Sequence, residues 1–131
     1  MRNDQWQLFF LACREVLGQG ANSSHLSESW CAWTTFRALK FGGIHYWTCG
    51  IPDYSEILDT KIEDGGLWRQ PFEYADIAHI IVPQTFYWET EGGQEFKNGT
   101  KTQNILALSE RLNREGIEHR ITDLVLEIKL Y

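Results

Sequence analysis

From residue 124 to residue 130 the sequence alternates between apolar and mostly polar positions. One set of alternate positions is formed by Leu124, Leu126, Ile128 and Leu130. The other set is formed by Val125, Glu127, Lys129 and the terminal Tyr131. Successive side chains of a strand point to opposite faces, so this period predicts a strand with one face in a core and one face mostly wet. Such a strand favours a largely antiparallel sheet whose helices lie on one side.

Two segments carry apolar side chains at the three- and four-residue spacing of an amphipathic helix. The stripe of the first consists of Trp6, Phe9, Phe10, Cys13, Val16 and Leu17. That of the second includes Ile105, Leu108 and Leu112. We expect the first helix to be capped by Asn3 or Asp4 and to end at Gly18 and Gly20. We expect the second to be capped by Thr100 or Thr102 and to be closed by Gly116.

Between the helices lie several runs rich in β-formers. Residues 33–41 and 44–49 are joined by Gly42 and Gly43, which predicts a hairpin, although a helix over residues 29–40 is a competing interpretation. Residues 77–82 and 85–90 also predict strands, and residues 94–97 a return strand that is broken at Asn98 and Gly99. The sequence therefore predicts a single α+β domain over residues 1–131. Its sheet is mostly antiparallel, with an N-terminal helix and a C-terminal-third helix packed on it.

The negative charge of the chain is confined to its middle third. Residues 50–95 contain ten acidic and two basic side chains, a net charge of −8, whereas the whole chain carries −6. A segment of this kind repels nucleic-acid phosphates and attracts a basic protein surface. An equally weighted interpretation is a solvated face that only keeps the protein soluble.

No motif in the sequence predicts a catalytic residue, a metal site or a cofactor site. The four histidines have no helical spacing to one another, and none stands at zinc-ligand spacing from a cysteine. The three cysteines, Cys13, Cys31 and Cys49, favour buried free thiols in a reducing cytoplasm. The apolar run over residues 8–13 is too short, and too close to charged residues, for a signal peptide or a membrane span. We therefore expect a cytoplasmic protein without membrane contact.

The short, acidic, tryptophan-rich α+β format resembles the small immunity proteins of bacterial toxin systems, including those of contact-dependent inhibition and of type VI secretion effectors. Asn3 followed by Trp6, together with the closing segment 102–131, also resembles a family of uncharacterised small bacterial proteins. The first resemblance implies an immunity protein that binds and neutralises a cognate basic toxin, such as a nuclease. It implies no catalytic residue, and with the acidic segment it favours a protein partner over nucleic acid.

The residues predicted to bind the partner are the acids and aromatics of the acidic segment. They are Asp53, Tyr54, Glu56, Asp59, Glu63, Asp64, Trp68, Glu89 and Glu91. Exposed aromatic anchors with flanking charge are typical of interface hot spots. Two hypotheses remain open beside this one. The first is a small enzyme whose metal- or His/acid-dependent hydrolytic site is assembled in three dimensions. The second is a homodimer in which aromatic strands pair across the interface.

Overall fold

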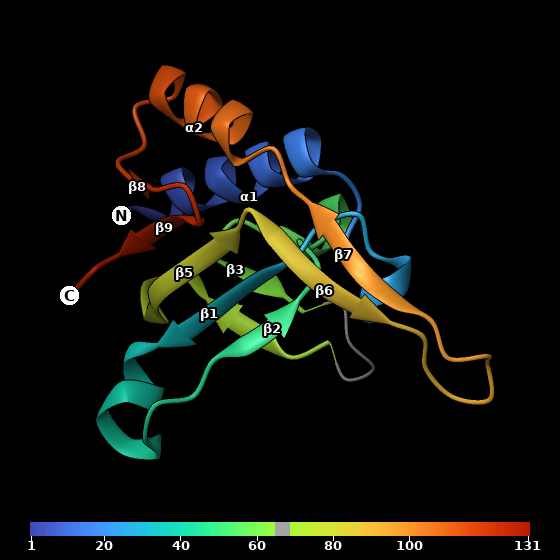
Figure 1. Ribbon diagram of the computed structural model, residues 1–131. Helices are drawn as coiled ribbons and strands as arrows, with labels where there is room; N and C mark the ends of the chain where they lie inside the picture. The colour runs from blue at the N-terminus through green and yellow to red at the C-terminus, as the bar shows by residue number, and fades with distance from the viewer. Residues whose placement is uncertain (65–68) are drawn as a thin grey trace.

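The computed structural model describes residues 1–64 and 69–131, and it confirms the α+β fold (Figure 1). Helices α1 (Asn3–Leu17) and α2 (Ile105–Arg114) accompany a five-stranded antiparallel sheet with the order β2-β1-β5-β9-β8. The bounds of these strands, in chain order, are β1 (Cys31–Thr35), β2 (Trp47–Cys49), β5 (Ile77–Pro83), β8 (Arg120–Ile121) and β9 (Val125–Lys129). None of the described helices is both long enough and apolar enough to span a bilayer.

The hydrophobic core lies between one face of this sheet and the two helices. Trp6, Phe9 and Phe10 of α1 are fully buried in it, as are Leu108 and Leu112 of α2. The sheet contributes alternate residues from its strands, namely Cys31, Trp33, Ile80, Val82, Leu126 and Ile128. The predicted period-two pattern of β9 is therefore confirmed at its centre. Its ends differ, because Leu124 is 74% exposed in the turn before the strand and Leu130 lies beyond it.

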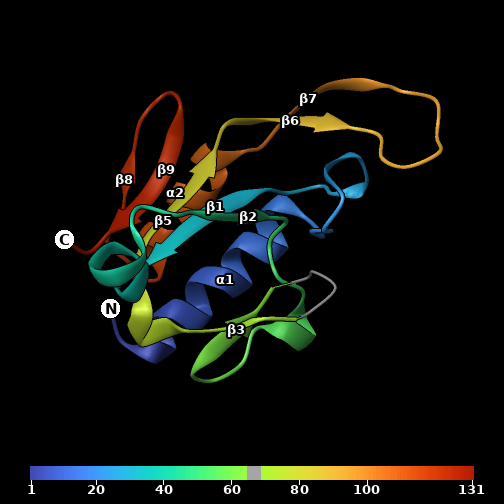
Figure 2. The same cartoon turned by 90° about the horizontal axis from the view of Figure 1, so that it is seen from below.

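A small second layer closes the core on the far side of α1 (Figure 2). Here β3 (Lys61–Glu63) pairs with β4 (Pro71–Glu73), between the short 3-10 helices η3 (Tyr54–Glu56) and η4 (Tyr74–Asp76). Tyr74 is fully buried, stacks on Phe10 with ring centroids 6.0 Å apart, and donates its hydroxyl hydrogen bond to the carbonyl of Leu58. Phe72 meets Trp33 edge to face. These rings are thus core residues.

The hairpin of β6 (Thr85–Glu89) and β7 (Asn98–Thr102) continues from the end of β5 and projects from the body of the protein (Figures 1 and 2). It lies beside a third 3-10 helix, η1 (Ser24–Leu26). At the opposite end of the molecule the two chain ends lie near each other, and Met1 and Leu130 line the same cavity.

Three sequence predictions about element boundaries were wrong. The return strand of the hairpin is 98–102 rather than 94–97, because Gly99 lets the indole of Trp88 pack directly on the backbone, where a Cβ atom would lie 3.0 Å from that ring. Helix α2 begins after Asn104, whose Oδ1 accepts from the N–H of Ala107, because Thr100 and Thr102 belong to β7. Helix α1 is capped at Arg2, whose N–H donates to Oε1 of Gln5.

The β1–β2 hairpin is confirmed, although its connection is longer than predicted. Strand β1 ends at Thr35, and the chain then forms a π-helical turn, η2 (Ala38–Gly42). Two side-chain acceptors hold this turn: Oγ1 of Thr35 accepts from the N–H of Ala38, and Oδ1 of Asp76 accepts from the N–H of Arg37. Asp76 is far along the sequence, so the pattern of residues 33–41 alone favoured a strand.

Candidate protein-binding site

Asp53 and Glu56, two of the predicted partner-binding acids, are used within the chain. Oδ1 of Asp53 accepts a hydrogen bond from Nε of Arg14 at 2.8 Å, and Oε1 of Glu56 accepts from the N–H of Asp53 at 2.9 Å. The bond from Arg14 holds the pKa of Asp53 below its usual range. Glu56 is buried. These two carboxylates hold η3 against α1 and leave little free charge for a partner.

The other predicted residues of this region lie around β3. The exposed Tyr54 covers the guanidinium of Arg14, whose central carbon is 4.8 Å from the ring centroid. Asp59 is exposed, Glu63 is half-buried in β3, and Oδ1 of Asp64 accepts from the N–H of Gln70. The predicted residue Trp68 lies outside the described residues.

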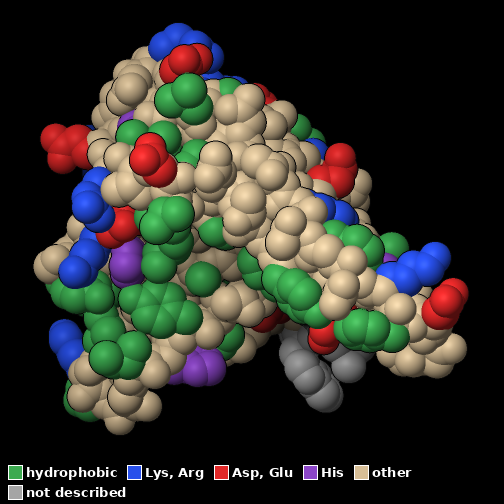
Figure 3. Space-filling model, viewed as in Figure 1, with side chains coloured by type: hydrophobic (Ala, Val, Ile, Leu, Met, Phe, Trp, Pro, Cys, Tyr) green, Lys and Arg blue, Asp and Glu red, His purple; other side chains and the backbone are tan. Residues whose placement is uncertain are grey.

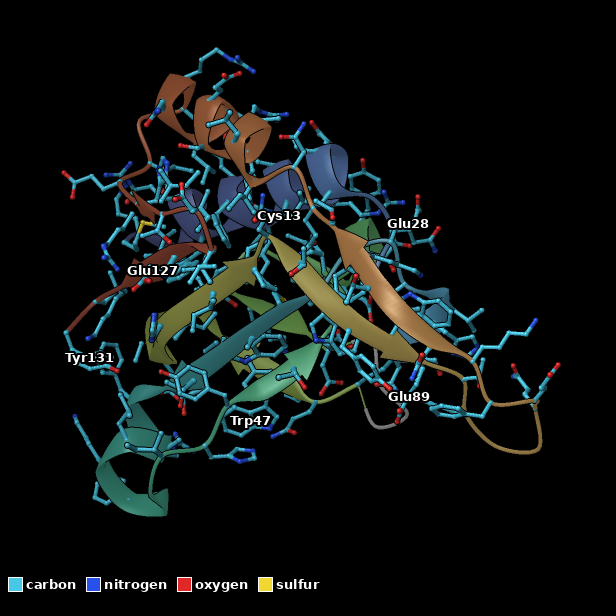
Figure 4. The ribbon with its side chains drawn as sticks, viewed as in Figure 1. Cys13, Glu28, Trp47, Glu89, Glu127 and Tyr131 are labelled. Atoms are coloured by element: carbon cyan, nitrogen blue, oxygen red, sulfur yellow. The ribbon has the colours of Figure 1, made fainter. Side chains whose placement is uncertain are left out.

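Glu89 and Glu91 lie elsewhere, on the β6–β7 hairpin. Glu89 is the last residue of β6 and Glu91 follows in the turn, well away from β3 in both ribbon views (Figures 1 and 2). Figure 4 labels Glu89 at the outer end of β6, on the right, and Glu127 on β9 of the five-stranded sheet, on the left. The predicted acids that the structure describes therefore form two separate groups rather than one surface. Of the two, only the hairpin group stands on a projecting element.

The turn of the hairpin is ordered by its own hydrogen bonds. Thr90 donates its N–H to the carbonyl of Lys97 and its hydroxyl to the carbonyl of Glu95, and its hydroxyl oxygen accepts the N–H of Lys97. A turn held in this way loses less conformational entropy on binding than a free loop. The side chains of Glu91 and Glu95 are thus presented from a defined backbone.

Two large apolar side chains are exposed on this hairpin. Tyr87 on β6 is 53% exposed and Phe96 in the turn is 64% exposed, while Phe86 points inward and stacks on Trp30. The hydroxyl of Tyr87 donates to Oε2 of Glu89 at 2.9 Å, and this bond raises the pKa of the phenol. Figure 3 shows hydrophobic side chains along the hairpin, with charged side chains at its outer end. Aromatic side chains are enriched at the hot spots of protein interfaces.

Polar contacts to η1 and its flanking loop fix the hairpin to the body. Ser23 donates its hydroxyl to Glu91, and the hydroxyl of Ser24 accepts the N–H of Glu89. The ammonium of Lys101 donates to the carbonyls of His25 and Ser27, at 2.9 Å each. The hairpin is therefore braced along its inner side.

The half-buried His119 joins two elements of the fold. Nδ1 of His119 lies 2.8 Å from the carbonyl of Ile117, which only accepts, so Nδ1 carries the proton of the neutral ring. Nε2 then accepts from the buried hydroxyl of Ser109, at 2.7 Å. This pair links α2 to the segment before β8. Among residues 1–64 and 69–131, no three His, Cys, Asp or Glu side chains converge as a metal site requires.

A cavity of about 680 Å³ lies between η2 and the β3–β4 pair. Its aromatic walls include Phe41, Trp47 and Phe72. Among the described residues that line it, the charged ones are two cations, Arg37 and Lys61, and two carboxylates, Glu73 and Asp76.

A scan against models of known protein families, a search of curated proteins and a search of solved structures each returned no match. The geometry of the hairpin also adds two surface residues that the sequence reasoning missed, namely Tyr87 and Phe96. A sequence signal for Phe96 exists in its position between the charged Glu95 and Lys97, just after two turn glycines. An aromatic residue in such a polar turn has no neighbouring apolar residues to pack with and is therefore expected on the surface.

Proposed function

We propose that this chain is a protein-binding domain that recognises a basic partner through the β6–β7 hairpin, and that it acts as an immunity protein against a toxin domain. The observation that carries the proposal is the projecting hairpin, on which exposed Tyr87 and Phe96 stand beside Glu89, Glu91 and Glu95. Aromatic anchors supply buried apolar area at an interface, and carboxylates supply selectivity for a cationic surface.

The charge distribution also supports binding of a basic partner at the hairpin. Residues 85–102 contain three carboxylates, Glu89, Glu91 and Glu95, and two lysines, of which Lys97 is exposed in the turn and Lys101 is turned inward onto carbonyl groups. A basic partner would be steered toward this end of the molecule, which raises the association rate at low salt. Leu26 of η1, the 3-10 helix beside β6, is a further exposed apolar residue.

The first experiment tests whether the chain neutralises a basic toxin. The chain is co-expressed with the product of the neighbouring gene as the candidate toxin, and growth, complex formation and stoichiometry are measured. We expect growth to be rescued and a stoichiometric complex to form. If the toxin remains active and no complex forms, the proposed function is wrong.

A second experiment locates the binding surface with a charge-matched control. The triple variant Glu89→Gln, Glu91→Gln, Glu95→Gln removes three charges from the hairpin. The control Glu110→Gln, Glu118→Gln, Asp123→Asn removes three exposed charges elsewhere. We expect the hairpin variant to associate about ten-fold more slowly at low salt and to lose much of the salt dependence, with the control close to wild type. Equal effects of the two variants would show that net charge alone matters.

A further inference from the structure

The outer edge of β7 presents backbone groups that the described part of the chain leaves unpaired. In the β6–β7 pair the N–H of Gln103 donates to the carbonyl of Gln84, and the N–H of Thr90 to that of Lys97. Between these bonded pairs the register is regular, with Tyr87 opposite Thr100. In an antiparallel pair every second residue points its N–H and C=O away from its partner strand. On β7 these residues are Asn98, Thr100 and Thr102.

The corresponding edge of β6 is covered, in contrast. The outward N–H of Glu89 donates to the hydroxyl of Ser24, and η1 lies along this side. On β7, no hydrogen bond within residues 1–64 and 69–131 uses the N–H groups of Asn98, Thr100 or Thr102, and β6 is its only strand neighbour. All three side chains are exposed.

The edge of β7 also lacks the features that usually prevent strand addition. The edge strands of the five-stranded sheet, β8 and β2, have only two and three residues, whereas β7 has five. Edge strands are commonly protected by proline or by outward lysine side chains. Strand β7 contains no proline, and its one lysine, Lys101, turns inward to the carbonyls of His25 and Ser27.

We propose that an extended, basic segment of the partner protein adds to β7 as a third strand of the β6–β7 sheet. Backbone hydrogen bonds to residues 98, 100 and 102 would give the affinity, and Glu89 would select for basic side chains. Glu89 lies opposite Asn98 in the register, on the same exposed face. A strand added to β7 would be two strand spacings, about 10 Å, from β6, which is within reach of a lysine or arginine side chain extending toward Glu89. This proposal rests on the proposed function and specifies its binding mode.

The first test uses a nine-residue peptide of alternating lysine and valine, with a peptide of alternating glutamate and valine as control. Amide hydrogen exchange of the wild-type chain is measured with and without each peptide. We expect the basic peptide to slow exchange at Asn98, Thr100 and Thr102, and the acidic peptide to have no effect. Unchanged exchange at these three amides, or protection elsewhere only, would overturn the proposal.

The second test uses Thr100→Pro, with Thr100→Ala as its matched control. Proline removes the outward N–H and is tolerated on a strand edge, whereas alanine keeps the N–H. We expect Thr100→Pro to bind the basic peptide about ten-fold or more weakly and Thr100→Ala to bind like wild type. Circular dichroism checks that both variants are folded. If both bind like wild type, β7 is not the acceptor strand.

The outcomes separate this proposal from the proposed function. If a basic toxin binds while residues 98, 100 and 102 stay unprotected, strand addition is wrong and the protein-binding function stands. If the basic peptide protects these amides but no toxin binds, strand addition stands and the immunity function is wrong. Protection that grows with protein concentration in the absence of peptide would identify a second copy of the chain as the occupant and overturn the choice of a basic segment.

Discussion

The hydroxyl of Tyr46 forms a hydrogen bond with Nδ1 of His79, 2.8 Å away, and donates it when the ring is neutral. The direction of this bond follows from the other ring nitrogen, because Nε2 of His79 lies 3.3 Å from Oε1 of Glu127, which as a carboxylate only accepts. Nε2 therefore carries the proton of the neutral ring and Nδ1 is the acceptor. Burial of the phenol, with the nearby hydroxyl of Tyr131, raises the pKa of Tyr46.

Replacing Glu127 tests how much the contacts among Tyr46, His79 and Glu127 contribute to the free energy of unfolding. In Glu127→Leu the N–H of the buried His79 loses its acceptor, and we expect the free energy of unfolding to fall by about 1–3 kcal/mol. Glu127→Gln keeps an accepting oxygen and should cost clearly less. Arg120, which also contacts Glu127 but is mostly exposed, should contribute under about 1 kcal/mol as Arg120→Ala. Urea unfolding measures all three variants, and equal losses for leucine and glutamine would contradict this account.

The pairing of Arg14 with Asp53 predicts a dependence of stability on pH. The pKa of Asp53 lies below its ordinary value of 3.8 in the folded state because of Arg14, so its contribution is present above that value and is lost as the pH falls through the lower folded value. In Arg14→Met the contribution is absent. We expect the stability difference between wild type and Arg14→Met to be largest near pH 5 and to shrink toward about pH 2.

The control for this prediction is the same pair of measurements on an Asp53→Asn background. There the carboxylate is absent, so the effect of Arg14→Met should no longer change between the two pH values. A difference that persists on this background would assign the pH dependence to another carboxylate. Chemical unfolding monitored by tryptophan fluorescence gives the free energies.

Gly116 ends α2 with φ at 71°, in the left-handed region that disfavours residues with a Cβ atom. Gly116→Ala should lower the free energy of unfolding by about 1–2 kcal/mol, and Gly116→Asn by less, because asparagine tolerates this conformation. Gly93→Ala is a suitable control, since no heavy atom lies within 4 Å of the added Cβ and its φ lies outside the left-handed range. Equal losses at the two positions would contradict the backbone argument.

The three cysteines are buried and unoxidised, and their reactivity should report on opening of the fold. Burial raises the pKa of the Cys13 thiol well above its usual range, so little thiolate is present. We expect a disulfide reagent such as dithionitrobenzoate to react with native protein at least about a hundred-fold more slowly than with protein in guanidinium chloride. Cys49, on the short edge strand β2, should react first of the three. Fast native labelling at Cys13 would contradict its burial (Figure 4).

The fold could be predicted from the sequence because its strongest signals are local. The stripe of α1 and the alternation of β9 each lie within one element, and burial confirms them at Phe9, Phe10, Leu126 and Ile128. The sequence predicts that the return strand ends at Asn98 and Gly99, whereas both residues belong to β7 because of a tertiary contact. Gly99 is required there by the ring of Trp88 on the neighbouring strand, and sequence order alone does not show that the two residues meet.

The candidate site could be predicted only in part. The acidic segment is visible in the sequence, but Asp53 and Glu56 resemble Glu89 and Glu91 there. What separates them is the position of Arg14 and the backbone of η3, since Arg14 lies 39 residues away from Asp53. A local sequence pattern shows where charged residues are, whereas only the folded chain shows which of them already interact with other groups of the same chain. The free edge of β7 likewise depends on register and on the position of η1.

The nearness of Met1 and Leu130 at the end of the molecule opposite the hairpin makes circular permutation practical. A short glycine–serine linker could join the two ends, and new termini could be opened between Gly92 and Gly93, in the exposed turn. The new termini would interrupt none of the five strands of the central sheet. Its β6 and β7 would become the two terminal segments, so the hairpin could be shortened one residue at a time from either side without touching the core.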